Sequence, residues 1–176
     1  AWSFKFIPKV FVPALDKQYF TVDVWLPEGS NIDETGKLAE EMAEYIRTHG
    51  EAEMVSTFIG RTPPRYYLSN VAFGPQSNYT QLLVKCHTSE ESRRLNAALQ
   101  DSIRLKFPGP LIKVNKFELS PLTEAVIEAR FLGPDPAVLD SLVGQAIEIM
   151  RRNPKVADAR NEWGNMALML RPSTIR

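Results

Sequence analysis

Hydrophobic and polar residues alternate strictly along residues 20–26, and this alternation predicts a β-strand with one buried face. Pro27 follows directly, and because proline cannot donate to a strand ladder we expect the strand to end there. One face carries apolar side chains and the other face is mixed. The apolar face consists of Phe20, Val22, Val24 and Leu26, and the mixed face of Thr21, Asp23 and Trp25.

Apolar residues recur at helical spacing over residues 32–48, which predicts an amphipathic helix. Ser30 with Asp33 three residues later approximates a capping box, so Ser30 is the expected N-cap. Gly50 supplies a residue that can adopt the left-handed conformation needed to stop the helix. A further alternating segment at residues 53–59 predicts the second strand.

The same order of strand, helix and strand occurs twice more. The second unit has a strand over 80–86, a helix opening at the Thr88–Glu91 capping box, and a strand over 111–119. In the third unit a strand over 124–132 precedes a helix that begins with Asp135 as N-cap and Pro136 as first residue. Short strands over 156–160 and 166–170 are expected after this helix.

These elements predict an α+β fold in which the first two units form a ferredoxin-like βαββαβ sandwich. The third unit supplies only a βαβ(β) half of a second sandwich, so we expect a piece of a larger protein. The predicted divisions are a lead over 1–19, a first domain over 20–120 and an incomplete second domain over 121–176.

Composition narrows the function classes. The chain has 176 residues, with 21 Lys and Arg against 21 Asp and Glu, so no net field favours nucleic acid or an anionic membrane. No apolar run reaches the roughly 18 residues of a membrane-spanning helix, and no signal-peptide pattern is present.

The sequence offers no catalytic constellation, metal-ligand spacing or phosphate loop, so we expect neither an enzyme nor a bound cofactor or metal. Cys86 is the single cysteine and ends the third strand, where a small buried residue is the favoured interpretation over a nucleophile. His87 is adjacent on the strand and so points to the opposite face.

The connection over residues 61–79 is unusually long for a compact domain, and such loops are often functional. It combines aromatic rings with arginines, and among these Arg65, Tyr66, Tyr67 and Phe73 are candidates for binding amphiphilic molecules. The alternative is that residues 66–68 form a short extra strand whose rings close the end of the sheet.

Several short motifs occur in an order typical of one transporter family. The block FVPALDKQYFTVDVWLPEGS (residues 11–30) comes first, followed by Phe-Ile-Gly at 58–60, Pro-Arg-Tyr-Tyr-Leu at 64–68 and Phe-Leu-Gly-Pro-Asp at 131–135. Asn153-Pro154 closes the series, and Lys155 departs from the glycine often found there. From residue 11 onward the chain resembles the second periplasmic half of RND-type efflux transporters, the acriflavine-resistance multidrug group.

This resemblance implies a periplasmic porter segment of an inner-membrane, proton-driven permease that works as a homotrimer. The implied partners are amphiphilic small molecules, the rest of the permease, a periplasmic adaptor and an outer-membrane channel. The entry cleft opens between two porter subdomains, and the 61–79 connection borders it. Positions carried over to its walls are Trp25, Lys116, Glu118, Glu128 and Arg160, beside the loop residues named above.

The alternative function is a stand-alone ferredoxin-like module that binds small molecules or regulates a partner. For each charged candidate the simpler interpretation is a solvated strand face, and for Trp25 it is burial under a helix.

Overall fold

The computed structural model describes residues 17–64, 74–117, 127–153, 156 and 159–164. The chain divides into two compact units, Ala1–Leu122 and Thr123–Arg176. In the first unit the elements follow the order β1 (Tyr19–Trp25), α1 (Ile32–Arg47), β2 (Ala52–Ile59), β3 (Tyr79–Cys86), α2 (Ser89–Lys106) and β4 (Leu111–Lys116). The described part of the second unit contains one helix, α3 (Pro136–Arg151).

The four strands form one sheet in the order β2-β3-β1-β4. Every neighbouring pair is antiparallel, and each helical crossover joins two strands that have a third strand between them. This is the split-βαβ arrangement of the ferredoxin-like fold. The predicted α+β class and βαββαβ order are therefore confirmed for the first unit.

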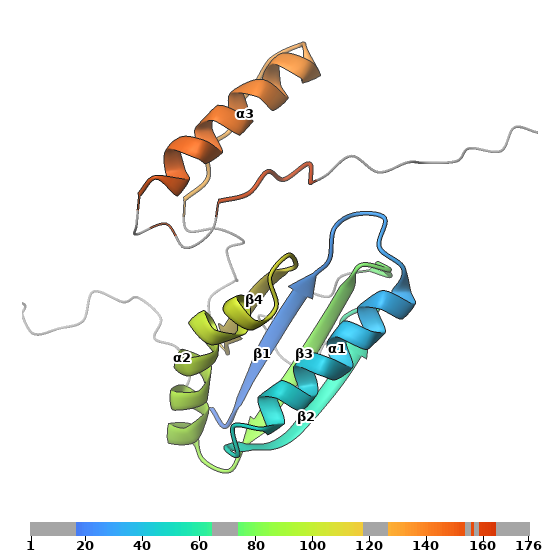
Figure 1. Ribbon diagram of the computed structural model, residues 1–176, viewed down its shortest axis with the longest axis vertical. Helices are drawn as coiled ribbons and strands as arrows, with labels where there is room; N and C mark the ends of the chain where they lie inside the picture. Colours follow the sequence, from blue (N-terminus) through green and yellow to red (C-terminus); the bar gives the residue numbers. More distant parts are fainter. Residues whose placement is uncertain (1–16, 65–73, 118–126, 154–155, 157–158, 165–176) are drawn as a thin grey trace, which may run out of the picture. The chain divides into compact units, whose positions relative to one another are not determined.

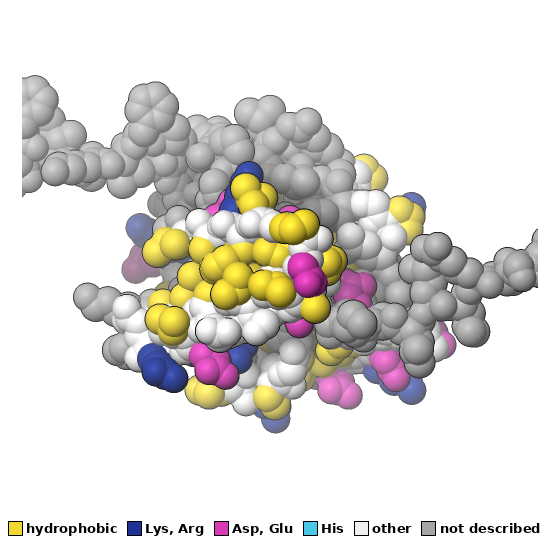
Figure 2. All heavy atoms as spheres, turned by 90° about the horizontal axis from the view of Figure 1, so that it is seen from above, with side chains coloured by type: hydrophobic (Ala, Val, Ile, Leu, Met, Phe, Trp, Pro, Cys, Tyr) yellow, Lys and Arg dark blue, Asp and Glu magenta, His cyan; other side chains and the backbone are white. Residues whose placement is uncertain are grey.

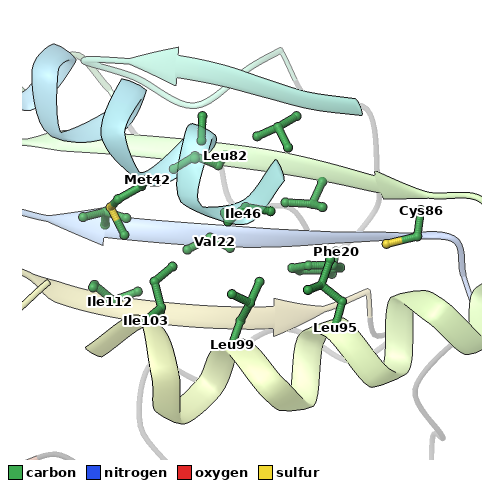
Figure 3. Packing of buried hydrophobic residues seen from close by; sticks show 14 residues of the cluster. Phe20, Val22, Met42, Ile46, Leu82, Cys86, Leu95, Leu99, Ile103 and Ile112 are labelled. Atoms are coloured by element: carbon green, nitrogen blue, oxygen red, sulfur yellow. The ribbon is translucent and has the colours of Figure 1, made fainter. Parts of the chain in front are cut away.

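Helices α1 and α2 cover the same face of the sheet (Figure 1). The core lies between these layers, where the alternating apolar residues of β1 meet the apolar stripes of both helices (Figure 3). The labelled core side chains come from every element of the first unit except β2 and are Phe20, Val22, Met42, Ile46, Leu82, Cys86, Leu95, Leu99, Ile103 and Ile112. The period-two pattern of the sequence thus correctly identifies the buried face of β1.

Helix α1 starts at Ile32, as predicted, but its N-cap is one residue later than expected. Asn31, not Ser30, is the N-cap: its Oδ1 accepts from the backbone N–H of Asp33 at 3.3 Å. The Glu34 carboxylate accepts from the backbone N–H of Asn31 at 3.4 Å, which completes the capping box. The prediction of Ser30 as cap was wrong because Asn31 followed by Glu34 offers the full reciprocal pair, whereas Ser30 with Asp33 offers only an approximation.

The other helix boundaries agree with the sequence signals. Thr88 and Glu91 form the predicted capping box of α2, and Asp135 caps α3 with Pro136 in its first turn. Gly50 follows α1 with a φ of 73°, as expected for a residue in the left-handed region.

Three predicted strands differ from the structure. Strand β4 ends at Lys116, and Phe117 is not in the ladder. Residues 127–132, the described part of the strand predicted over 124–132, are not in a strand, and residues 156, 159 and 160 are not in one either. Alternation alone does not make a strand, because a strand also needs a neighbour for its backbone groups. The strand predicted over 166–170 lies outside the described residues.

None of the residues of α3 is buried. Its apolar positions include Val138, Leu142 and Ile149, which are all exposed. Hydrophobic side chains also gather as a band on the molecular face shown in Figure 2, with acidic and basic side chains around it.

Candidate functional site: the helix-free face of the sheet

The face of the sheet opposite α1 and α2 carries a group of polar and aromatic side chains. In the β1–β3 ladder Asp23 lies opposite Gln81, and Trp25 lies opposite Tyr79. In the β1–β4 ladder Asp23 lies opposite Lys113. Residues directly opposite each other in an antiparallel pair project from the same face. Since Val22 and Val24 belong to the core, Asp23 and Trp25 lie on the other face, which we call the helix-free face.

Asp23 is the centre of a hydrogen-bond network on the helix-free face. Its Oδ1 accepts from the hydroxyl of Tyr79 at 2.5 Å and from Nε2 of Gln81 at 2.7 Å. Its Oδ2 accepts from Nδ2 of Asn115 at 2.7 Å. The carboxylate is therefore held by donors from both strands that flank β1. A carboxylate that is 5% exposed needs such partners, because burying an unpaired charge is costly.

One polar atom of this network has no hydrogen-bond partner among the described residues. Gln81 is 2% exposed, and its Oε1 accepts no hydrogen bond there. The orientation of this amide follows from its neighbour, because only the NH₂ group can donate to the Asp23 carboxylate. The network therefore leaves a buried carbonyl acceptor beside a carboxylate. Such an atom calls for an explanation in a folded protein.

Aromatic rings adjoin the network on one side. The Trp25 and Tyr79 ring centroids are 5.2 Å apart with an interplanar angle of 46°. The ammonium Nζ of Lys113 lies 5.5 Å from the centroid of the Trp25 ring, within the range of a cation–π contact. Trp25 and Lys113 are half-buried, whereas Tyr79 is fully buried. The helix-free face thus combines a carboxylate, an amide acceptor and an accessible indole.

The backbone around this site is anchored at both ends of the 61–79 connection. The Gln76 N–H donates to the carbonyl of Gly60, and the Gly60 N–H donates to the carbonyl of Tyr79, both at 2.8 Å. The Asn78 Nδ2 donates to the carbonyl of Leu26 at 3.0 Å and to the carboxylate of Glu28 at 3.2 Å. These bonds fix the start of β3 against the end of β1. The positions of Tyr79 and Trp25 follow from them.

Gly60 is constrained in two ways at this point. Its φ is 77°, and a Cβ at this position would lie 3.0 Å from Cδ1 of Ile32. A larger residue would meet both the left-handed backbone and the start of α1. Because Gly60 has no side chain, the end of β2, the start of α1 and the start of the 61–79 connection can lie close together.

Comparison with protein families identifies the chain. Residues 1–171 match the model of the AcrB/AcrD/AcrF family. The chain belongs to this family. The resemblance to RND efflux transporters seen in the sequence is thereby confirmed, and members of the AcrB/AcrD/AcrF family are transporters rather than enzymes. No curated protein matches the chain.

Membership of the AcrB/AcrD/AcrF family gives the predicted wall residues their context, and the structure describes four of them within their own units. Trp25 lies on the helix-free face. Lys116 lies opposite Phe20 in the β1–β4 ladder, which places it on the core side and at the other end of the strand. Glu128 and Arg160 are exposed residues of the second unit, and Glu128 forms an ion pair with Arg130 at 3.5 Å. The structure does not bring Lys116 together with Trp25. The remaining predicted residues, Arg65, Tyr66, Tyr67, Phe73 and Glu118, lie outside the described residues.

Sequence reasoning missed the network of Asp23, Tyr79, Gln81 and Asn115 as a site. The available signal was Asp23 itself, a carboxylate between Val22 and Val24 on the first strand of the predicted βαββαβ sandwich. A charge at such a position needs partners on adjacent strands. The identity of those partners depends on the register, which the sequence pattern does not supply.

Cys86, Lys85 and Glu53 of this AcrB/AcrD/AcrF family chain have shifted pKa values. Cys86 is buried, as predicted, and this burial raises the pKa of its thiol to about 11. Lys85 and Glu53 pair at 2.8 Å, and this hydrogen bond lowers the pKa of Glu53 and raises that of Lys85. Among the described residues, none of these three groups shares a hydrogen bond with the Asp23 network.

The described residues add two negative observations. They contain no group of three or more His, Cys, Asp or Glu side chains positioned to hold a metal ion. Within the same residues, no helix has the length and hydrophobicity needed to cross a bilayer.

Proposed function

We propose that this chain is a periplasmic porter segment of a proton-driven RND multidrug efflux permease, and that its helix-free face forms part of the wall of a cleft for amphiphilic organic substrates. The match to the AcrB/AcrD/AcrF family over residues 1–171 is the observation that carries this proposal. The helix-free face supports it, because an accessible indole beside a few polar groups suits amphiphiles of varied shape.

In this proposal residues 20–120 are the first porter subdomain and residues 121–176 are the first part of the second, preceded by a membrane-proximal lead over 1–19. The division of the chain into units at 122/123 is compatible with these limits. The cleft opens and closes as the subdomains rock against each other as rigid bodies. Such alternation requires two packings of similar free energy that substrate and the membrane domain bias.

The proposed substrate contacts are Trp25 on the helix-free face and the loop residues Arg65, Tyr66, Tyr67 and Phe73, with Lys116, Glu118, Glu128 and Arg160 as charged positions. The loop assignment is supported by the anchoring of the 61–79 connection next to Trp25 and Tyr79. The proposed assembly is a homotrimer joined to a periplasmic adaptor and an outer-membrane channel, with proton coupling supplied by spanning helices of the permease.

An efflux assay tests the proposal. The parent permease is expressed in cells that lack their own multidrug pumps, and accumulation of a fluorescent amphiphilic dye is measured. Trp25→Ala should raise dye accumulation several-fold, because it removes an aromatic contact that contributes about 1 kcal/mol or more to the binding free energy of the substrate. Trp25→Phe should retain most of the efflux because it keeps an aromatic face.

Leu105→Ala is the control, because Leu105 is exposed on α2, which covers the opposite face of the sheet. Immunoblots must show equal amounts of each permease in the membrane. Unchanged accumulation in Trp25→Ala, at equal expression, would contradict the assignment of the helix-free face. Absence of efflux for every amphiphile would contradict the multidrug function itself.

A further inference from the structure

We propose that Asp23 and Gln81 form a head-group subsite on the helix-free face for a protonated amine that carries at least one N–H. The inference rests on the proposed function and deepens it, because it names the chemical class of substrate that this face selects. The selected class is an amphiphile with a primary, secondary or tertiary ammonium head, as distinct from a quaternary ammonium, a neutral alcohol or an anion.

Asp23 and Gln81 together have unused hydrogen-bond capacity. An ionised carboxylate has about four lone-pair positions, and the hydrogen bonds from Tyr79, Gln81 and Asn115 occupy two on Oδ1 and one on Oδ2 of Asp23. An amide carbonyl has two lone pairs, and Oε1 of Gln81 uses neither among the described residues. The network therefore has unused acceptors on two side chains that are hydrogen-bonded to each other. A ligand that supplies N–H donors satisfies them, and a ligand without N–H does not.

The hydrogen bond from Asn115 to Asp23 is the one that a ligand can replace. Both donors to Oδ1, Tyr79 and Gln81, are almost completely buried. The donor to Oδ2 is Asn115, which is half-buried and lies on β4 at the edge of the sheet. An ammonium that arrives from solvent can therefore replace the Asn115 amide on Oδ2 without disturbing the two inner bonds. A charge-assisted N–H···O⁻ bond is stronger than the neutral amide bond that it replaces.

The charge of Asp23 and the adjoining ring of Trp25 both favour a cationic head group. Asp23 contributes a negative charge to the site, and Trp25 offers the face of an indole. The chain already places an ammonium within cation–π range of this ring, since Nζ of Lys113 lies 5.5 Å from its centroid. The Trp25 ring thus tolerates an ammonium within cation–π range, and a bound head group shares this surface with Lys113. An apolar tail attached to that head can contact the accessible indole.

A set of four probes with the same tail tests the inference on the full, unmodified chain. The probes are dodecylamine, dodecyltrimethylammonium, dodecanol and dodecyl sulfate, each measured by calorimetry below its micelle concentration at pH 7. Dodecylamine should bind about tenfold or more tighter than dodecyltrimethylammonium, because both are cations and only the amine donates hydrogen bonds. The side-chain amide signals of Asn115 and Gln81 in NMR spectra should shift with dodecylamine and not with the quaternary probe.

Two variants sharpen the test. Asp23→Asn should remove the preference for the amine over the quaternary probe. Asn115→Ala should strengthen amine binding, because it removes the competing donor on Oδ2, whereas a purely structural role of Asn115 predicts equal weakening of all four probes. Glu53→Gln is the matched control: it removes a carboxylate that pairs with Lys85 and should leave the order of the probes unchanged. Circular dichroism must confirm that each variant is folded. If Asp23→Asn does not fold, the comparison of the four probes on the unmodified chain still tests the subsite.

The outcomes separate the two proposals. If all four heads bind equally, or if the quaternary probe binds as tightly as the amine, the subsite is refuted while a general amphiphile cleft survives. If dodecylamine does not bind, the subsite is refuted whatever the efflux assay gives. If the permease also exports none of the four probes or any dye, the proposed function fails as well.

Discussion

The hydroxyl of Tyr79 donates a hydrogen bond to the carboxylate of Asp23 across 2.5 Å, although 56 positions separate the two residues in sequence. The bond joins β3 to β1 on the helix-free face. A shift of one residue in β1 would turn Asp23 towards the core, and the same shift in β3 would turn Tyr79 and Gln81 away from it. This pair therefore helps to specify the register of the two central strands.

The first prediction concerns Tyr79→Phe. This change removes one donor to a buried carboxylate and keeps the ring in place, so it should lower the free energy of unfolding by about 1.5–3 kcal/mol. Urea denaturation followed by circular dichroism measures the loss. Tyr45→Phe is the matched control, because among the described residues the Tyr45 hydroxyl makes no hydrogen bond. Equal effects of the two changes would contradict the role of the Tyr79 hydroxyl.

The second prediction distinguishes the two residues that could cap α1. Asn31→Ala should destabilise the protein by about 0.5–2 kcal/mol, because it leaves a helix N–H without its side-chain acceptor. Ser30→Ala should change stability by much less. Ser30 contributes its backbone carbonyl, which accepts from Ser77, and this bond survives the substitution. Thermal or urea unfolding of both variants measures the two losses of stability. A larger loss of stability in Ser30→Ala would identify Ser30 as the N-cap of α1.

The third prediction compares two leucines on α2. Leu99 is fully buried in the core, whereas Leu105 is 83% exposed. Leu99→Ala should cost about 2–5 kcal/mol through lost burial and an unfilled cavity. Leu105→Ala makes the same chemical change on the same helix and should cost less than about 0.5 kcal/mol. A similar loss for both would mean that the helix face towards the sheet has been assigned wrongly.

The fourth prediction concerns pH and Cys86, whose pKa burial raises from 9.0 to about 11. Because the folded state keeps its thiol proton longer than the unfolded state, the contribution to stability is complete below pH 9 and is lost as pH rises towards 11. The free energy of unfolding of the parent should therefore fall relative to that of Cys86→Ala across this interval. If the free energies of unfolding of the two proteins changed in parallel from pH 8 to pH 11, the raised pKa of Cys86 would be contradicted.

Reactivity provides a second measurement on the same residue. A buried thiol with a raised pKa has little thiolate at pH 8, so a thiol-specific reagent should modify Cys86 only as fast as the protein opens. Mild urea should accelerate the reaction in step with the unfolded fraction.

The sequence pattern was sufficient for the first unit because local signals and the fold agree there. Alternation in β1 identified Phe20, Val22 and Val24 as core residues, and the capping box at Thr88 located the start of α2. The same kind of signal was insufficient where two candidates compete within two residues. Ser30 and Asn31 both suit an N-cap by residue type, and the outcome depended on which one reaches its partner.

The candidate site was less predictable for a physical reason. The Asp23 network joins residues of three strands, and its members become neighbours only through the register of the β1–β3 and β1–β4 ladders. The same register explains why Lys116, which is one strand away from Trp25 in the sheet, is on the other face. Residues 127–132 illustrate a related limit, since an alternating pattern carries no information on whether a neighbouring strand is present to pair with it.

The last prediction concerns α3, whose residues are all at least partly exposed. Isolated helices of about this length are marginal in water, and most helix stability in proteins comes from packing of an apolar face. Helix α2 packs Leu95, Leu99 and Ile103 into the core. Amide hydrogens of α3 should therefore exchange at least about tenfold faster than those of α2 when the full chain is studied by mass spectrometry or NMR. Equal protection would show that the apolar positions around Leu142 and Ile149 are covered in solution. Sedimentation at several concentrations would then establish whether a second copy supplies the cover, because only self-association makes the protection of α3 depend on protein concentration.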